Sequence, residues 1–137
     1  MISKNMEKAL NEQINAELYS AYLYLSMVSY FKSLNLDGFA QWMTVQTQEE
    51  VAHAMKFFTF VNDRGGRALL APIDGPQTEW KSPLEAFEAA YKHEQLVTKR
   101  IDNLVKLARK ETDTATEIML QWFVTEQVEE EANFSLI

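Results

Sequence analysis

Residues 46–57 read QTQEEVAHAMKF, and this stretch decides the fold because a helical pattern of apolar residues runs through it and encloses an acid and an imidazole. At about 100° per residue, Glu50 shares one helix face with four apolar side chains: Phe39, Met43, Phe57 and Val61. His53 lies at the edge of the same face. The spacing therefore predicts a helix that points both Glu50 and His53 into a core.

The composition indicates a soluble, acidic, mostly helical domain. Hydrophobic residues make up 47% of the 137 residues and aromatic residues 12%, which excludes a disordered chain. Four glycines and three prolines are too few for the many turns of a β-sandwich or barrel. The lack of cysteine excludes disulfide scaffolds, iron–sulfur clusters and cysteine-bound zinc. The net charge of −7 argues against nucleic acid or an anionic membrane as the main partner.

Neither a secretion signal nor a membrane span can be recognised in the sequence. Residues 1–10 lack a cationic start followed by an apolar run and a cleavage site. No apolar run reaches the length of about 18 residues that a membrane span requires. We therefore expect a cytoplasmic protein without a membrane partner.

Helical periodicity predicts four long helices. They cover about residues 5–34, 39–64 and 83–110, and the last runs from 113 or 114 toward the C-terminus. We expect Asp37 to cap the second helix.

The remaining helix ends carry local signals. Gly65 and Gly66 end the second helix. Ser82 caps the third helix, with Pro83 at its first position and Glu85 completing a capping box. Thr114 and Glu117 predict a second capping box at the start of the fourth helix.

A seventeen-residue connection, Gly66–Ser82, separates the second and third helices. At about 3.3 Å per residue it can run back along the whole length of a helix of this size. The two short connections make antiparallel hairpins, and the long one makes helices two and three parallel. The sequence therefore predicts an all-α four-helix bundle with one long crossover, as one domain over residues 1–137.

All four predicted helices place polar residues on the face that should be apolar. The two halves of the chain repeat one pattern. A glutamate is followed 33 residues later by Glu-x-x-His in the first half and by Gln-x-x-Glu in the second. In antiparallel hairpins, equal spacing puts these positions at similar depth. The six positions are Glu17, Glu50, His53, Glu94, Gln127 and Glu130.

Four inward carboxylates require either a metal or protonation. Burying one unpaired carboxylate costs several kcal/mol or neutralises the group. No Lys or Arg lies on the same faces near enough to compensate. Two divalent cations would supply the missing positive charge. A carboxylate-rich site with one imidazole suits iron or manganese and is too rich in oxygen for structural zinc.

A second layer of acids adjoins the first. Glu49 and Glu126 fall at the edge of the apolar faces, and Glu129 precedes Glu130. With Glu130 as a bridge, these acids could hold a third, wetter cation. The alternative for each of Glu49, Glu126 and Glu129 is a solvated surface glutamate, and the pattern leaves that open.

The first helix predicts association with other subunits. It is apolar nearly all round from Leu18 to Phe31, and several large side chains point away from the Glu17 face. A single bundle would expose these side chains, so we expect a partner subunit to cover them. They are Tyr19, Tyr22, Leu23 and Met27.

Over essentially the whole chain, the residues resemble the bacterial non-haem ferritins. The first hairpin carries Asn11-Glu12-Gln13, Glu17-Leu18-Tyr19-Ser20 and Gln48-Glu49-Glu50 with His53. The second carries Tyr91-Lys92-His93-Glu94-Gln95, Gln121-Trp122 and Glu126-Gln127-Val128-Glu129-Glu130-Glu131. The resemblance implies a ferritin-like four-helix bundle that oxidises Fe²⁺ with O₂ or H₂O₂ and stores iron. It also implies a twofold dimer as the building unit of a cytoplasmic 24-subunit shell.

The same resemblance implies roles for individual residues. The ligands that it implies for the first iron are Glu17, Glu50 and His53. Those for the second iron are Glu50, Glu94 and Glu130, with Glu50 bridging. Those for a third iron are Glu49, Glu126, Glu129 and Glu130. Gln127 would orient ligands by hydrogen bonding, and Tyr24 would lie beside the centre as an electron donor, although a core aromatic fits its pattern equally well.

Several residues differ from those of related families and so favour the non-haem ferritins over them. Haem-carrying bacterioferritins have Met directly after the helix-two glutamate and Glu-x-x-His in both halves, whereas Val51 and Gln127-x-x-Glu130 stand here. We therefore expect no haem. Rubrerythrins need cysteines, and there are none.

Non-haem ferritins continue past the position of Ile137 into a short fifth helix that lines a fourfold channel. That helix is absent from this sequence, which leaves closure of a shell open.

Two other functions remain as alternatives. The first is a different di-iron enzyme, of the peroxidase or oxygenase type, that releases its product without storing iron. The second is a non-catalytic helical interaction module whose inward glutamates are protonated. Oligomeric size and mineral content separate the first alternative from a ferritin, and metal binding separates the second.

Overall fold

A computed structural model describes residues 1–136 of the chain, and within them all regular structure is helical. The helices are α1 (Lys4–Ser33), α2 (Asp37–Asp63), α3 (Pro83–Lys110) and α4 (Thr114–Ser135). The all-α prediction is confirmed, and the predicted helix ends differ from the observed ones by at most two residues. None of these helices of residues 1–136 has both the length and the apolar character needed to cross a membrane.

The chain packs as two compact units. The first, Met1–Ala86, holds α1, α2 and the long crossover. The second begins at Phe87 and holds most of α3 together with α4. Each unit contains one helical hairpin, and this division coincides with the two halves of the sequence repeat.

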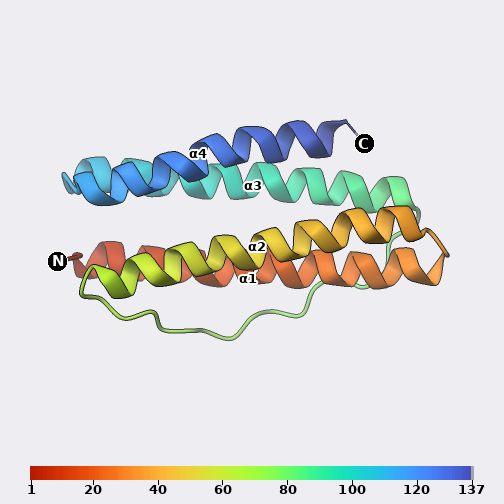
Figure 1. The fold of residues 1–137 in the computed structure, drawn as a ribbon, viewed down its shortest axis with the longest axis horizontal. Coiled ribbons are helices and arrows are strands. Elements are labelled where there is room, and N and C mark those ends of the chain that lie inside the picture. Colours follow the sequence, from red (N-terminus) through yellow and green to blue (C-terminus); the bar gives the residue numbers. More distant parts are fainter. Residues whose placement is uncertain (137) are drawn as a thin grey trace. The chain divides into compact units, whose positions relative to one another are not determined.

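The first unit is built on the α1–α2 hairpin, whose helices lie antiparallel and side by side (Figure 1). Asn35 adopts a left-handed φ of 59° at the turn, a conformation that asparagine tolerates. The backbone N–H of Leu36 donates to the carbonyl of Phe31 at 3.0 Å and so closes the end of α1. Leu36 is also the N-cap residue of α2. The expectation that Asp37 caps this helix is therefore wrong, because the tight turn makes Asp37 the first helical residue.

Helix α2 ends at the predicted glycine pair. Gly65 has a left-handed φ of 81°, and the N–H of Gly66 donates to the carbonyl of Val61 at 3.0 Å. A side chain at Gly66 would be crowded, since an added Cβ would lie 2.7 Å from Oε2 of Glu7 and 3.0 Å from Cγ2 of Ile2.

The crossover runs in extended form along the hairpin of the first unit (Figure 1) and is tied to α1 by side chains. Asn11 donates to the carbonyl of Arg67, and Asn15 to that of Pro72 at 3.0 Å. Further along, the Ser26 hydroxyl donates to a crossover carbonyl at 2.7 Å. These bonds explain how a segment without helix or strand satisfies part of its backbone.

The far end of the crossover is anchored by an aromatic residue. Trp80 is buried, and its ring meets that of Tyr30 edge-on at a centroid distance of 5.4 Å. This geometry is one that aromatic pairs prefer. The crossover thus reaches α3 from a fixed point on α1.

In the second unit, helices α3 and α4 form another antiparallel hairpin (Figure 1). The start of α3, which still belongs to the first unit, is capped as predicted, since Ser82 accepts a hydrogen bond from the N–H of Glu85 at 3.2 Å. At α4 the cap is Asp113, which accepts from the N–H of Thr116 at 3.1 Å and from its hydroxyl at 2.7 Å. The predicted capping box at Thr114 is wrong, because the Asp113 carboxylate already fills that role.

The apolar faces are buried largely as predicted, with two corrections. Phe39 is 41% exposed; its ring packs at 5.6 Å on Phe31 at the hairpin end, where less of the helix is covered. Leu23 and Met27 are buried within the chain and need no partner subunit. The crossover covers part of this side of α1, since it is bonded along the helix from Asn11 to Ser26.

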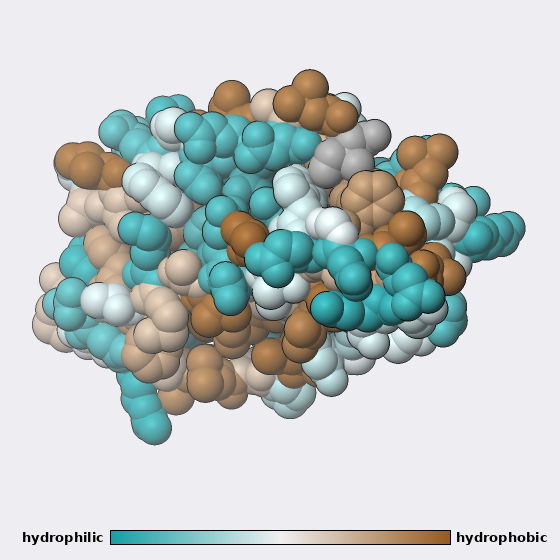
Figure 2. Space-filling view, turned by 45° about the vertical axis from the view of Figure 1, so that its right-hand side comes forward, coloured by the Kyte–Doolittle hydropathy of each residue, from teal (hydrophilic) through white to brown (hydrophobic). Residues whose placement is uncertain are grey.

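Some large apolar side chains remain at the surface. Tyr22 and Leu25 of α1 are each about half exposed, at 49% and 51%, while Tyr19 is half-buried. Leu70 of the crossover is 67% exposed. Figure 2 shows apolar side chains standing among hydrophilic ones on one face of the molecule. Association between subunits stays a prediction that rests on such exposed side chains.

Candidate metal centre

The first unit brings two carboxylates and an imidazole together. The antiparallel α1–α2 hairpin sets Glu17, near the middle of α1, opposite Glu50 and His53 of α2. Nδ1 of His53 lies 3.5 Å from Oε2 of Glu50 and 3.8 Å from Oε2 of Glu17. Each of the three residues is at most 3% exposed. All three offer ligand atoms within 4.8 Å of one another, which is the spacing of a metal-binding group.

Glu17 is held in place by its own helix. Nε2 of Gln13, one turn earlier on α1, donates to Oε1 of Glu17 at 3.1 Å. The other oxygen, Oε2, has no hydrogen bond among residues 1–136. Burial would raise the pKa of Glu17, but the polar groups of Glu50, His53 and Gln13 around its carboxyl and the positive potential of His53 hold the pKa below its ordinary value. Glu17 is thus kept as a carboxylate with one oxygen available to a cation.

The second unit brings together the matching positions of the repeat. Glu94 on α3 and Gln127 and Glu130 on α4 are all buried. Glu94 and Glu130 each offer an oxygen within 4.8 Å of the other. Nε2 of Gln127 donates to Oε2 of Glu94 at 3.1 Å and lies 3.3 Å from its backbone carbonyl.

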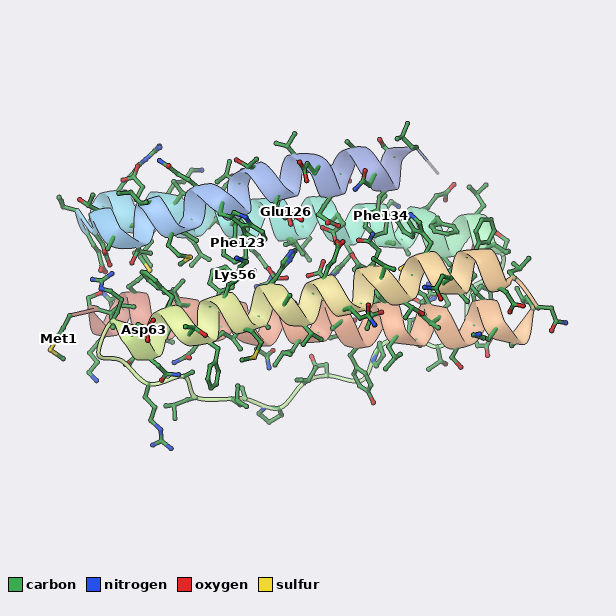
Figure 3. All side chains as sticks on the ribbon, viewed as in Figure 1. Met1, Lys56, Asp63, Phe123, Glu126 and Phe134 are labelled. Atoms are coloured by element: carbon green, nitrogen blue, oxygen red, sulfur yellow. The ribbon has the colours of Figure 1, made fainter. Side chains whose placement is uncertain are left out.

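The outer acids differ in exposure. Glu49 on α2 and Glu126 on α4 are half-buried, whereas Glu129 is exposed. Glu126 lies between Phe123 and Phe134 along α4 (Figure 3) and offers an oxygen within 4.8 Å of one from Glu130. The structure therefore groups Glu126 with Glu130 and leaves Glu129 outside that pair, on the solvent side of the helix.

Tyr24 is completely buried, two turns beyond Glu17 on the same helix. This position suits both readings of the residue, a core aromatic and a neighbour of the centre. Its role as an electron donor stays a prediction.

Three polar residues of the site were missed by sequence reasoning. Gln13 bonds Glu17, and Thr98 on α3 bridges Gln127 and Glu131 of α4. Thr98 and Glu131 are half-buried, so the pattern does not distinguish them from surface residues. Gln13 carried a usable signal, because it lies one helical turn from Glu17 on the same face.

The donor set favours a transition metal over other ligands. The first unit offers carboxylate oxygens and one imidazole, which suit iron or manganese. In the second unit, the buried residues Glu94, Gln127 and Glu130 offer two carboxylates and one carboxamide. Buried charges are usually paired or coordinate a metal, because burying them alone is costly.

A sequence model of the family described as the ferritin-like domain matches residues 7–137. The chain belongs to the ferritin family. A bacterial non-heme ferritin of Bacteroides fragilis is 48% identical to this ferritin over 132 residues, which is 96% of this chain and 83% of the relative. One of Staphylococcus saprophyticus is 45% identical over 98% of this chain and 80% of the relative.

Solved structures of ferritins share the fold of this ferritin. The open pore ferritin of Archaeoglobus fulgidus is 60% identical and superposes with a TM-score of 0.96, covering 98% of this chain and 83% of that one. The ferritin of Chlorobium tepidum is 44% identical, with the same TM-score and the same coverage. The predicted ferritin-like four-helix fold is therefore confirmed.

Proposed function

We propose that this ferritin oxidises Fe²⁺ at a buried dinuclear centre and stores the product as hydrated Fe³⁺ oxide. One observation carries the proposal. Within the first unit of a ferritin chain, Glu17, Glu50 and His53 form a buried group with the spacing of metal ligands. Iron is the substrate and the cargo of this reaction.

The proposed centre uses both halves of the repeat. Glu17, Glu50 and His53 bind the first iron, and Glu50 bridges to the second. Glu94 and Glu130 complete the second iron site. The equal 33-residue spacing in the two halves and the burial of every one of these residues support this pairing. Two divalent cations balance the four carboxylates, which are costly to bury alone.

The carboxylates drive the oxidation electrostatically. Anionic oxygen ligands stabilise the more highly charged Fe³⁺ relative to Fe²⁺, so they favour loss of an electron. Each O₂ accepts four electrons and thus oxidises four Fe²⁺ ions. With six waters, the products are four FeO(OH) and eight protons. Positioning two irons side by side lets one oxidant collect electrons from both.

Further residues act around this centre in the proposal. Gln127 orients Glu94 by hydrogen bonding, and Tyr24 is an electron donor beside the centre. A third iron binds the outer acids. Its ligands are Glu49, Glu126, Glu129 and Glu130. Of these, Glu126 and Glu130 offer neighbouring oxygens, while exposed Glu129 must turn inward when the iron binds.

We also propose the setting of the reaction. Twofold dimers of the chain build a 24-subunit shell in the cytoplasm, and the oxide collects inside it. The exposed apolar side chains Tyr22 and Leu25 of α1 support association. The reaction needs Fe²⁺ and O₂ or H₂O₂, with neither haem, nucleic acid nor a membrane as a partner.

One iron addition, read out in several ways, tests the function against its alternatives. Fe²⁺ is added in excess under air, and the particle mass and the iron retained per chain are measured by analytical ultracentrifugation and elemental analysis. Iron that stays with a large assembly supports storage. Oxidation by a small assembly that retains no iron indicates a different di-iron enzyme. Absence of both metal binding and oxidation indicates an interaction module.

A further inference from the structure

A chain of hydrogen bonds in the second unit links a half-buried acid to a buried ligand candidate. The Thr98 hydroxyl donates to Oε2 of Glu131 at 2.6 Å. Nε2 of Gln127 donates to Oγ1 of Thr98 at 3.1 Å and to Oε2 of Glu94 at 3.1 Å. The chain crosses between α3 and α4 at each step, so it couples the two helices of this hairpin.

The direction of these bonds follows from donor and acceptor chemistry. A carboxylate oxygen accepts, so Thr98 gives its single hydroxyl proton to Glu131. The Thr98 oxygen then has only lone pairs left for Gln127. Lone pairs can be met by the NH₂ group of an amide and not by its carbonyl oxygen. Glu131, at one end of this series of hydrogen bonds, therefore determines which way the Gln127 amide faces.

The orientation of the amide matters for Glu94. With its NH₂ group inward, Gln127 stabilises Glu94 as a carboxylate and engages Oε2. A flipped amide would set its carbonyl oxygen against the Glu94 carboxylate, which is repulsive. The flip would also release Oε2 from its hydrogen bond. One oxygen of Glu17 is engaged in the same way by Gln13 in the first unit, so in each hairpin a side-chain amide orients the leading glutamate.

We propose that Thr98 and Glu131 are positioning residues for the amide of Gln127. They turn its NH₂ group toward Glu94, where it donates to Oε2 and so fixes the orientation of this carboxylate as a metal ligand. This inference rests on the proposed function in one respect, namely that Glu94 is a metal ligand. It adds that the binding mode of this ligand is set by a residue, Glu131, that does not itself touch the metal.

The orientation is tested first on the protein without added metal. Thr98→Val removes the hydroxyl at nearly unchanged size, and Gln127→Leu removes the amide. If Thr98 and Gln127 are joined by these hydrogen bonds, the melting temperature of the double variant falls clearly less than the sum of the decreases in the two single variants. Additive losses overturn the proposal. This result does not depend on iron chemistry, so it stays separate from the proposed function.

The consequence for metal binding is tested with Co²⁺, which prefers the same oxygen and nitrogen donors without being oxidised by air. Its dissociation constant and visible absorption are measured by titration of the complete protein. Loss of a bond that orients a ligand weakens metal binding by about 10- to 100-fold. We therefore expect Thr98→Val to weaken binding by about 10-fold and to change the Co²⁺ spectrum, and Thr98→Ser to restore both.

Matched variants separate orientation from packing. Thr125→Val makes the same chemical change at an exposed threonine of α4 and leaves Co²⁺ binding unchanged. Glu131→Gln lets residue 131 donate as well as accept, so it weakens binding in the same direction as Thr98→Val, while Glu88→Gln on the exposed side of α3 does not. If Thr98→Val does not fold, Glu131→Gln carries the test. Wild-type binding in Glu131→Gln, or failure of Thr98→Ser to restore binding, overturns the proposal.

Discussion

The side-chain amide of Gln13 donates a hydrogen bond of 3.1 Å to Oε1 of Glu17, one helical turn further along α1. Both residues are buried, and Oε2 of Glu17 is left on the side of His53, 3.8 Å from its Nδ1. The bond therefore fixes the rotation of the carboxylate before any cation arrives. A ligand that is oriented in advance loses less freedom when the metal binds.

Removing this bond should weaken the first iron site. We expect Gln13→Leu to slow Fe²⁺ oxidation and to weaken Co²⁺ binding by about 10-fold, the range found when a bond to a metal ligand is lost. Stopped-flow oxidation and Co²⁺ titration measure the two effects. Gln95→Leu, at an exposed position of α3, is the control and should behave as wild type. Equal effects of the two variants would show that the Gln13 bond has no part in the site.

Metal should stabilise the fold through the buried acids. A cation that binds only the folded chain raises the free energy of unfolding by about 2.7 kcal/mol at a hundredfold excess over its dissociation constant. We therefore expect Co²⁺ to raise the melting temperature and a chelator to reverse the rise. In a variant that combines Glu50→Ala with His53→Ala, the helices persist by circular dichroism and the Co²⁺ shift disappears. An undiminished shift in that variant would place the cation elsewhere.

The start of the crossover should not tolerate a side chain at Gly66. An added Cβ would lie 2.7 Å from Oε2 of Glu7, and that oxygen accepts the N–H of Arg67 at 3.1 Å. Moving Glu7 breaks this bond, so we expect Gly66→Ala to destabilise the fold by about 1–3 kcal/mol in chemical denaturation. At Gly38, the second residue of α2, a Cβ meets nothing within 4 Å. Gly38→Ala should instead stabilise the fold by up to about 1 kcal/mol, and the opposite order would refute the crowding at Gly66.

The two aspartates at helix starts should differ in their contribution to stability. Asp113 accepts from the N–H and the hydroxyl of Thr116, whereas Asp37 is the first residue of α2 and does not cap it. We expect Asp113→Ala to cost about 1 kcal/mol. Asp37→Ala loses only the favourable charge at a helix start, about 0.3–1 kcal/mol. Thermal unfolding of both variants measures the two losses of stability. An equal or larger loss of stability in Asp37→Ala would contradict the observed caps.

The helices could be predicted from the sequence because the apolar periodicity extends over many turns, and each turn repeats the same signal. Four residues of the site lie on buried helix faces as predicted: Glu17, Glu50, His53 and Glu94. One acid on an apolar face is weak evidence for a site, whereas acids at a repeated spacing on several helices are strong evidence. The caps were harder. Asp37 and Thr114 both look like capping residues, and only the geometry of the preceding turn shows that neighbouring residues occupy the cap positions.

Other features could not be predicted because they depend on contacts far apart in the sequence. The crossover has no periodicity, so its bonds to Asn11, Asn15 and Ser26 leave no pattern. Thr98 and Glu131 are half-buried and look like surface residues until their hydrogen bond is seen. The local sequence pattern thus predicts which side chains are buried, but it does not predict which hydrogen-bond partner a polar side chain finds.

The central claim is that the buried acids form a centre that binds and oxidises iron. The most direct measurement adds Fe²⁺ anaerobically in increasing ratio to the chain, admits air, and follows the near-ultraviolet absorbance of Fe³⁺. The proposed centre predicts a fast phase whose amplitude stops growing near about two irons per chain, or about three if the outer acids bind, and which is lost in the Glu50→Ala, His53→Ala variant. Slow oxidation without a break, or a fast phase that survives in this variant, would contradict the centre.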